Sequence, residues 1–351
     1  MSKKEVDYII VGQGLAGSIL AWFLLKENIS FVIIDELKGE TSSTKASGLI
    51  NPITGRRFVK SWMSEELMSF AKETYTEIEQ KLNCSLFKET KIHRILQTVE
   101  QQNDWASKVE DERFRDFLGK KDLVHYDKSI IKNDLACIEI APVYKIDTPV
   151  LISCLSDYYT QKDLIIRQKF DYSLLEVNES EVDYKGIKAK KIIFCEGFNM
   201  VYNPFFKNIP LFLSKGEVLH FEAKDLPQEY VLGGNTNIIP LGNHTFSVGA
   251  TYGWGDTSPE PTQAKKDELI EKLEAIIKCP YKLLEHNAGI RPTVKDRRPV
   301  IGAHPEHKNI LVFNGLGTKG LSLSPYFAQQ FVQFLDGDVE LNEEVLVERF
   351  F

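Results

Sequence analysis

A short apolar run followed by three closely spaced glycines constrains the fold of this chain more than any other feature. Residues 6–11 (VDYIIV) form a run typical of a buried parallel strand, and Gly12, Gly14 and Gly17 follow at once. The residues after Gly17 are largely apolar, as expected for a helix that packs on a sheet, and residues 31–34 form a second apolar run. The order of strand, glycine turn, helix and strand predicts a parallel βαβ unit in an α/β fold.

Each of the three glycines has a separate physical reason. Gly12 permits the tight turn, Gly14 lets a pyrophosphate approach the backbone, and Gly17 lets the helix and the strand pack closely. The turn would therefore hold a diphosphate at the positive end of the helix, beside the amides of Leu15 and Ala16. An ordinary strand–turn–helix without a ligand is the alternative.

An acidic residue completes the dinucleotide fingerprint. Asp35 stands 23 residues after Gly12, where the second apolar run ends, and its carboxylate can accept hydrogen bonds from ribose hydroxyls. Glu36 is the fallback for this role. The fingerprint by itself does not distinguish FAD from NAD.

Length, charge and cysteine spacing limit the function classes. At 351 residues the chain has room for about two domains. Its net charge of −7 provides no general basic field for nucleic acid or anionic lipid, although residues 55–60 (GRRFVK) form a local basic patch that is either solvated or phosphate-facing. Five separated cysteines without a C-x-x-C pair, and no signal-peptide core or long apolar span, indicate reduced thiols and a cytoplasmic location.

Later segments of the chain bear on which dinucleotide binds. They are a Ser/Thr/Gly loop at 41–52, a strand at 187–197 that ends in glycine, residues 210–219, residues 288–302, and a glycine-rich loop after a buried strand at 309–313. Together with the first sixty residues, these segments resemble the D-amino acid oxidase family of FAD-dependent oxidoreductases, in its glycine oxidase, sarcosine oxidase and ThiO-like branch. The resemblance is weakest between about 60 and 135.

In this family the first of these loops follows the cofactor. It runs along the ribityl and pyrophosphate groups and then turns beneath the isoalloxazine ring, a path that suits small residues and backbone amides. The residues that the resemblance places there are Ser43, Thr44, Ala46, Ser47, Gly48, Leu49 and Asn51.

The strand at 187–197 resembles the family strand that returns to the cofactor and ends in Ala-x-Gly. Gly197 would let the chain pass close to the dinucleotide, whereas Cys195 and Glu196 depart from the small residues usual at their positions. We interpret Cys195 as a packed thiol rather than a catalyst. Phe170 matches a position whose backbone meets the adenine.

Residues 288–302 carry the most specific part of the resemblance, a glycine, an arginine and a proline followed by an aspartate and a second proline. The resemblance implies that Arg291 grips the substrate carboxylate beside the flavin, and a planar guanidinium suits two parallel bonds to a carboxylate. A structural salt bridge is the alternative. Arg297 departs from the turn glycine usual in the family.

Three further residues are candidates for the pocket. Asn237 falls about where several amino acid oxidases have a substrate-binding tyrosine. Tyr252 and Trp254 could line the pocket, but core aromatics are the more ordinary interpretation. No H-E-x-x-H or H-x-H pairing occurs among seven histidines, so we expect no metal site.

The closing glycine-rich loop would face the pyrimidine edge of the flavin, with the helix at about 321–335 behind it. Its residues are Gly315, Gly317, Thr318, Lys319 and Gly320; Thr318 stands where glycine oxidase adds a further basic residue. Some relatives attach FAD to a cysteine in this loop. No cysteine is present here, so we expect FAD to be bound non-covalently.

The resemblance also implies the architecture and the activity. It predicts an α/β fold: a Rossmann-type FAD-binding domain (1–59, 141–204 and 291–351) plus an α+β substrate domain (60–140 and 205–290) with a mostly antiparallel sheet. The expected reaction is oxidation of the C–N bond of an amino acid or secondary amine. Hydride passes to the flavin, the imine is hydrolysed, and oxygen or a quinone accepts the electrons. A flavin oxidase acting on a carboxymethylaminomethyl-uridine tRNA base, or a non-catalytic flavin-binding protein, remains an alternative.

Overall fold

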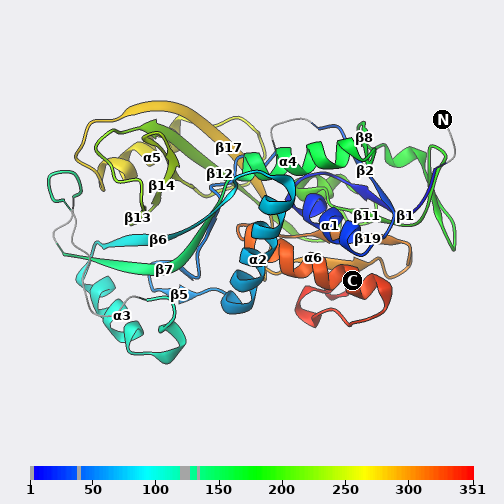
Figure 1. The fold of residues 1–351 in the computed structure, drawn as a ribbon, viewed down its shortest axis with the longest axis horizontal. Coiled ribbons are helices and arrows are strands. Elements are labelled where there is room, and N and C mark those ends of the chain that lie inside the picture. Colours follow the sequence, from blue (N-terminus) through cyan, green and yellow to red (C-terminus); the bar gives the residue numbers. More distant parts are fainter. Residues whose placement is uncertain (1–3, 38–40, 119–126, 133–134) are drawn as a thin grey trace.

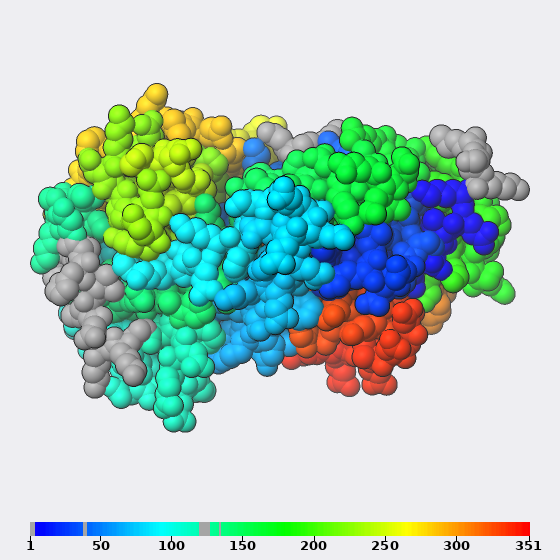
Figure 2. All heavy atoms as spheres, in the orientation of Figure 1, coloured from blue at the N-terminus to red at the C-terminus, as the bar shows by residue number. Residues whose placement is uncertain are grey.

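Two large sheets lie side by side along the long axis of the molecule (Figure 1). The computed structural model describes residues 4–37, 41–118, 127–132 and 135–351. Figure 2 shows that the two halves form one continuous packed surface on this face. Among the described residues, no helix is long and apolar enough to cross a membrane.

The first sheet contains the βαβ unit expected from the glycine turn. Its strands, in spatial order, are β18 (Val300–Ala303), β19 (Ile310–Asn314), β11 (Ile187–Phe194), β1 (Lys4–Val11), β2 (Phe31–Asp35) and β8 (Ile165–Arg167). All neighbours are parallel except β18 and β19, and the antiparallel pair β9 (Leu175–Val177) and β10 (Val182–Tyr184) extends the sheet from β11. Strands from three distant parts of the sequence therefore meet around β1.

Four helices pack together beside this sheet, and the first of them is the helix of the βαβ unit. They are α1 (Leu15–Lys26), α2 (Ser64–Leu82), α4 (Thr148–Gln161) and α6 (Gly320–Asp336). Residues 16–24 of α1 are all buried, because α1 lies between the sheet and its helical neighbours. The hydroxyl of Tyr159 donates a hydrogen bond to the carbonyl of Ser18 at 2.7 Å and fixes α4 on α1. Tyr75 of α2 makes the same kind of bond to Leu321 of α6 at 2.8 Å.

The second sheet is mostly antiparallel. In spatial order its strands are β16 (Gly253–Trp254), β12 (Leu211–Glu222), β15 (Thr245–Gly249), β14 (Asn237–Gly242), β13 (Val231–Gly233), β6 (Phe87–Leu96), β7 (Ala136–Ile146) and β3 (Leu49–Ile50), and β17 (Lys282–Val294) pairs with β12. Only β13 and β6 run parallel. Outside the sheet are α3 (Val99–Val109), α5 (Gln263–Glu274) and the small hairpin β4 (Ile53–Thr54) and β5 (Val59–Lys60).

Short 3₁₀ helices fill several connections and the C-terminal segment. They are Glu112–Phe114, Tyr172–Leu174, Gly197–Tyr202, Glu343–Val345 and Val347–Phe350.

The predicted fold class is confirmed: a parallel sheet with helices stands beside a mostly antiparallel sheet. The domain limits stay a prediction. Two of the predicted limits, 140/141 and 290/291, fall inside the long strands β7 and β17. Each of these strands begins in the second sheet and extends to the loops beside the first sheet. Likewise β3, which follows the Ser/Thr/Gly loop directly, pairs with β7.

Candidate functional site

Two of the three glycines in the turn after β1 leave no room for a side chain. Gly12 has φ of +100°, and a Cβ there would lie 2.6 Å from the carbonyl oxygen of Cys195. A Cβ on Gly17 would lie 1.9 Å from the carbonyl oxygen of Gly12, whereas on Gly14 it would lie 3.4 Å from Ser43 Oγ. The N-cap residue Gly14 offers no capping side chain of its own, and the positive end of α1 beside this turn is suited to an anion.

Asp35 is fixed at the end of β2, beside this turn. Its Oδ2 accepts a hydrogen bond from the amide of Gln13 at 2.6 Å, and its Oδ1 accepts one from the amide of Leu37. Each carboxylate oxygen keeps a further lone pair, which is what a ribose hydroxyl would use. The neighbouring Glu36 is exposed.

The Ser/Thr/Gly loop connects the two halves of the molecule. Ser43 Oγ accepts a hydrogen bond from the amide of Leu15, the first residue of α1, at 2.9 Å. Ser42 Oγ donates to the carbonyl of Ile290 in β17 at 2.6 Å, and Lys45 Nζ donates to Asn287 Oδ1 at 2.8 Å. The loop therefore lies against both the cofactor helix and the second sheet.

The rest of this loop contacts its own backbone, strand β7 and helix α4. Thr44 Oγ1 donates to the carbonyl of Thr41 at 2.9 Å. Gly48 has φ of +75°, and a Cβ there would lie 2.1 Å from the carbonyl oxygen of Ile146, so this position requires glycine. Ser47 lies between them, half-buried, and the exposed Ala46 accepts a bond from the Thr148 hydroxyl at 3.3 Å.

After Gly48 the chain enters β3 at Leu49 and then turns at Asn51. Asn51 Oδ1 accepts a hydrogen bond from the amide of Ile53 at 3.0 Å, and the carbonyl of Asn51 accepts one from Ser61 Oγ at 3.3 Å. Asn51 thus fixes both ends of the β4–β5 hairpin.

The end of β11 lies against the glycine turn. Cys195 is buried, and burial raises the pKa of its thiol well above the ordinary value, which supports the packed-thiol interpretation. Glu196 accepts hydrogen bonds from the Tyr172 hydroxyl and, at 2.7 Å, from Asn203 Nδ2; burial raises the pKa of its carboxyl. Gly197 has φ of +56° and open space where a Cβ would stand.

Phe170 lies in an aromatic cluster beneath this region. Its ring stacks on Tyr184 with centroids 4.4 Å apart and packs edge-on against Phe194. Two residues earlier, the amide of Gln168 donates to the carbonyl of Asp35 at 3.0 Å. The ring is therefore a packing group, and only the backbone of this segment lies beside the dinucleotide fingerprint.

The closing loop returns to α1. A Cβ on Gly320 would lie 2.9 Å from Leu15 Cδ2, and one on Gly315, where φ is +72°, would lie 2.8 Å from Val300 Cγ2. A Cβ on Gly317 would lie 3.2 Å from Thr293 Oγ1 in β17, and Thr318 is exposed. The four glycine-containing segments therefore surround the start of α1.

Lys319 brings a positive charge into the closing loop. Its ammonium donates to Ser61 Oγ, and no carboxylate in the described part of the chain pairs with it. Burial, together with the nearby Arg297 and Arg298, lowers the pKa of Lys319 to about 8. Its protonation can therefore change near neutral pH.

Arg291 lies on β17 between one residue that contacts the Ser/Thr/Gly loop and another that contacts the closing loop. Alternate residues of a strand share a face. On this face of β17, Gly289 packs against Ser42 and Thr293 against Gly317. Arg291 is the residue between Gly289 and Thr293, so it belongs to the part of the second sheet that faces both cofactor loops.

The guanidinium of Arg291 fills the space that Gly216 leaves on the neighbouring strand. It lies above Gly216 of the neighbouring strand and 5.0 Å from the ring centre of Tyr252, and its Nη1 donates to the carbonyl of Thr251 at 3.3 Å. Burial lowers the pKa of Arg291. The expected alternative, a structural salt bridge, is absent among the residues that the structure describes. A half-buried cation without a carboxylate is suited to an anionic ligand.

Two residues that the sequence did not single out hold the segment around Tyr252. On the opposite face of β12, the buried Lys215 donates to Asp256 Oδ2 at 2.7 Å and to Ser258 Oγ at 2.9 Å. The buried Glu217 accepts from the amide of Thr262 at 2.8 Å. The Lys-Gly-Glu sequence at 215–217 was the available signal, since two charges at positions i and i+2 of a strand share a face.

Three other expectations have different outcomes. Asn237 lies on β14, with β15 and β12 between it and β17, so it does not reach Arg291. The core interpretation of Tyr252 and Trp254 is wrong, because their exposed fractions are 57% and 65%; both follow the end of β15, at the edge of the sheet. Arg297 has φ of +59°, which explains why a glycine is usual there.

One group of possible metal ligands occurs in the β18–β19 turn. Ligand atoms of His304, Glu306 and His307 lie within 4.8 Å of one another. The Nδ1 of His304, however, accepts the amide hydrogen of Glu306 at 3.2 Å. This H-P-E-H arrangement differs from the H-E-x-x-H and H-x-H patterns, and we assign no metal to it.

The chain is similar to known proteins over most of its length. Residues 7–333 match the family model described as FAD dependent oxidoreductase (DAO). Glycine oxidase of Bacillus subtilis is 25% identical over 98% of this chain and 95% of that protein. A tRNA 5-methylaminomethyl-2-thiouridine biosynthesis bifunctional protein of Marinobacter nauticus is 23% identical over 92% of this chain and 54% of that protein. The crystal structure of glycine oxidase from Geobacillus kaustophilus has a TM-score of 0.80, with 18% identity and 96% of each chain covered.

Proposed function

Because the chain belongs to the family of FAD-dependent oxidoreductases, we propose that it oxidises the C–N bond of an amino acid or secondary amine that carries a carboxylate. One observation carries this proposal: the guanidinium of Arg291 faces the cofactor loops without a carboxylate partner among the described residues. A substrate carboxylate would supply the missing negative charge through two parallel hydrogen bonds.

The residues present fit FAD. The diphosphate would lie at the start of α1, where Gly12 and Gly17 leave no room for a side chain and the N-cap residue Gly14 has none. Asp35 would hold the ribose and the loop at 41–48 the ribityl chain. FAD, when bound, supplies the hydride acceptor for C–N oxidation. Its retention without a covalent bond is part of this proposal.

The chain itself would position the substrate. Arg291 holds the carboxylate, and its own orientation is fixed by Thr251, by the ring of Tyr252 and by the space above Gly216. Protonated Lys319 adds a second positive charge in the closing loop, where negative charge accumulates as the cofactor is reduced. Fixing the carboxylate and the amine reduces the entropy cost of reaching the reactive arrangement.

The test is an anaerobic titration of the purified holoenzyme with amino acids and N-methyl amino acids, followed by flavin absorbance. We expect bleaching by at least one carboxylate-bearing amine and none by the matching decarboxylated amine. Equal bleaching by both amines would contradict the role of Arg291. Reoxidation by oxygen or by a soluble quinone, measured in the same cuvette, identifies the electron acceptor.

The tRNA alternative has one specific argument, the similarity to the bifunctional tRNA-modifying protein over 92% of this chain. A glycine-like leaving unit on a tRNA base would still require Arg291. The net charge of −7 argues against a large phosphate-binding surface. Reduction of the flavin by modified tRNA and by no free amino acid would favour it, and a flavin that no amine bleaches would indicate a binding protein.

A further inference from the structure

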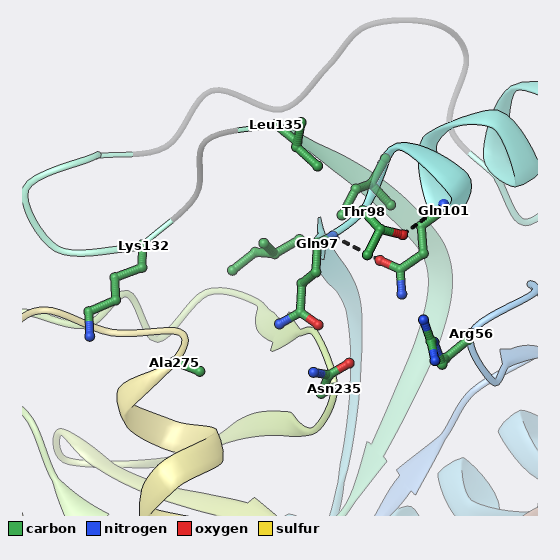
Figure 3. A pocket seen from close by; sticks show the side chains of 10 residues that line it. Arg56, Gln97, Thr98, Gln101, Lys132, Leu135, Asn235 and Ala275 are labelled. Atoms are coloured by element: carbon green, nitrogen blue, oxygen red, sulfur yellow. Dashed lines mark hydrogen bonds between the residues drawn. The ribbon is translucent and has the colours of Figure 1, made fainter.

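A polar pocket lies in the second half of the molecule, apart from the cofactor loops. Its volume is about 490 Å³, and it opens among the β4–β5 hairpin, the end of β6, the start of α3 and the β13–β14 turn (Figure 3). Polar side chains gather around this space, from Arg56, Gln97, Thr98, Gln101 and Asn235. A volume of this size accommodates a small-molecule ligand.

The charges around the pocket are positive. Arg56 makes no ion pair with any residue that the structure describes, and none of the described lining residues is acidic. Behind it, the buried Arg94 donates to the carbonyl of Gly55 at 2.8 Å and stacks on Phe58, again without a carboxylate partner in the described ranges. Burial lowers the pKa of Arg94 to about 10, so it stays charged at neutral pH.

The neutral lining is ordered and presents hydrogen-bond donors. Gln101 is only 5% exposed, and its Oε1 accepts the amide hydrogen of Gln97 at 2.8 Å. The Nε2 group is then left as a donor. Thr98 caps α3 by accepting from the amide of Gln101 at 3.2 Å, which fixes this part of the lining.

The pocket is not an extension of the Arg291 site. Asn235 precedes β14, and β15 and β12 separate β14 from the strand of Arg291. Three strand spacings amount to about 14 Å, which is too far for one small amino acid to span.

We propose that this pocket binds a small oxyanion, a phosphate or a carboxylate, as a second ligand distinct from the oxidised amine. Arg56 supplies the charge-assisted bond, and Gln101, Gln97 and Asn235 supply amide donors. The basic sequence at 55–60 thereby has a specific role, because Arg56 lines the pocket and Arg57 does not.

Isothermal titration of the FAD-loaded protein with inorganic phosphate, and separately with malonate, tests the proposal without any turnover. We expect Arg56→Ala to weaken binding of at least one probe about fivefold, which is about 1 kcal/mol. The matched control Arg57→Ala changes one exposed positive charge next to it and should leave binding unchanged. Asn235→Ala, at an exposed turn, should weaken binding with the same probe and without affecting the fold.

The two probes distinguish the sources of the oxyanion: tighter phosphate binding indicates a phosphorylated ligand and tighter malonate binding a carboxylate ligand. Equal binding by wild type and Arg56→Ala, or equal weakening by Arg56→Ala and Arg57→Ala, would overturn the proposal. Because binding is measured directly, failure of this proposal leaves the amine oxidation untouched, and failure of the oxidation leaves this pocket untouched.

Discussion

The guanidinium of Arg291 occupies the space that the missing side chain of Gly216 leaves on the neighbouring strand. A Cβ built on Gly216 would lie 1.9 Å from Arg291 Nη2 and 2.2 Å from its Cζ. Gly216 is flanked by Lys215 and Glu217, which hold the segment of Thr251 and Tyr252 from the opposite face of β12. Three consecutive residues thus determine where the guanidinium lies.

The first prediction concerns this space. Gly216→Ala should displace the guanidinium and reduce the rate of flavin reduction by a carboxylate-bearing amine about tenfold or more, as expected when a charged contact is misplaced. The far end of the arginine can move, so the fold should persist. Anaerobic stopped-flow absorbance measures the rate. Gly253→Ala is the matched control, since a Cβ there makes only ordinary contacts at 3.6 Å; equal rates in wild type and Gly216→Ala would contradict the arrangement.

The second prediction compares two glycines of the dinucleotide turn. Gly17→Ala places a methyl group 1.9 Å from a backbone carbonyl, so the turn must open, and overpacking of this kind costs about 1–3 kcal/mol or more. Gly14→Ala meets only a serine hydroxyl at 3.4 Å. We expect Gly17→Ala to lose FAD on gel filtration and to melt at a lower temperature than Gly14→Ala. The reverse order would show that the turn tolerates Gly17 substitution.

The third prediction concerns attachment of the cofactor. Acid precipitation should release FAD into the supernatant, because the closing loop has no cysteine and the nearby Cys195 is buried with a raised pKa. Absorbance of the supernatant and intact mass of the pellet measure the partition. A yellow pellet with a mass increase equal to FAD would show a covalent bond.

The fourth prediction is a pH dependence that arises from Lys319. Its folded-state pKa is lowered to about 8, below the ordinary value of about 10.4. The ammonium is charged below about pH 8, so substrate affinity or the flavin potential should fall as pH rises through that value. Lys319→Met should remove this step, and Lys319→Arg should keep the charge and shift the step to higher pH.

The lowered pKa of Lys319 also affects the free energy of unfolding, and this effect has the opposite pH trend. Between about pH 8 and pH 10.4 the unfolded chain binds more protons at this lysine than the folded chain, so the contribution of Lys319 to the free energy of unfolding becomes more favourable as pH rises. Lys319→Met should therefore raise the melting temperature at pH 7, with a gain that disappears above about pH 10. A gain independent of pH would assign the effect to packing instead.

The sequence was sufficient for the features that depend on local geometry. The glycine turn could be predicted because a positive φ angle and close backbone approaches permit few residue types, and Asp35 because of its spacing from that turn. Gly48 was identified only by resemblance. Arg291 could be identified by resemblance, but its environment could not. The space above Gly216 and the anchoring by Lys215 depend on the pairing of β12 with β17 and β16, which periodicity along one strand does not reveal.

The same limit applies to Tyr252, Trp254 and Asn237. Tyr252 and Trp254 are aromatic residues of a type often found in cores. Both are exposed because they follow the end of β15 at the edge of the sheet. Asn237 was placed by position in the resemblance, where strand order rather than sequence distance decides proximity to Arg291.

The last prediction concerns the two substitutions of Arg291. Arg291→Ala removes the cation and its two hydrogen-bond donors, and flavin reduction by carboxylate-bearing amines should fall about a hundredfold, which is about 3 kcal/mol. Because no carboxylate of the described residues pairs with Arg291, its loss strands no buried negative charge, so FAD content and melting temperature should stay close to wild type. Arg291→Lys keeps the charge but loses the planar pair of donors, so it should raise the apparent dissociation constant for substrate more than it lowers the limiting rate. The measurement is anaerobic flavin reduction over a range of substrate concentrations, with melting temperature and FAD content as controls. An Ala variant that reduces as fast as wild type would make Arg291 a structural residue, and the substrate would then be an amine without a carboxylate.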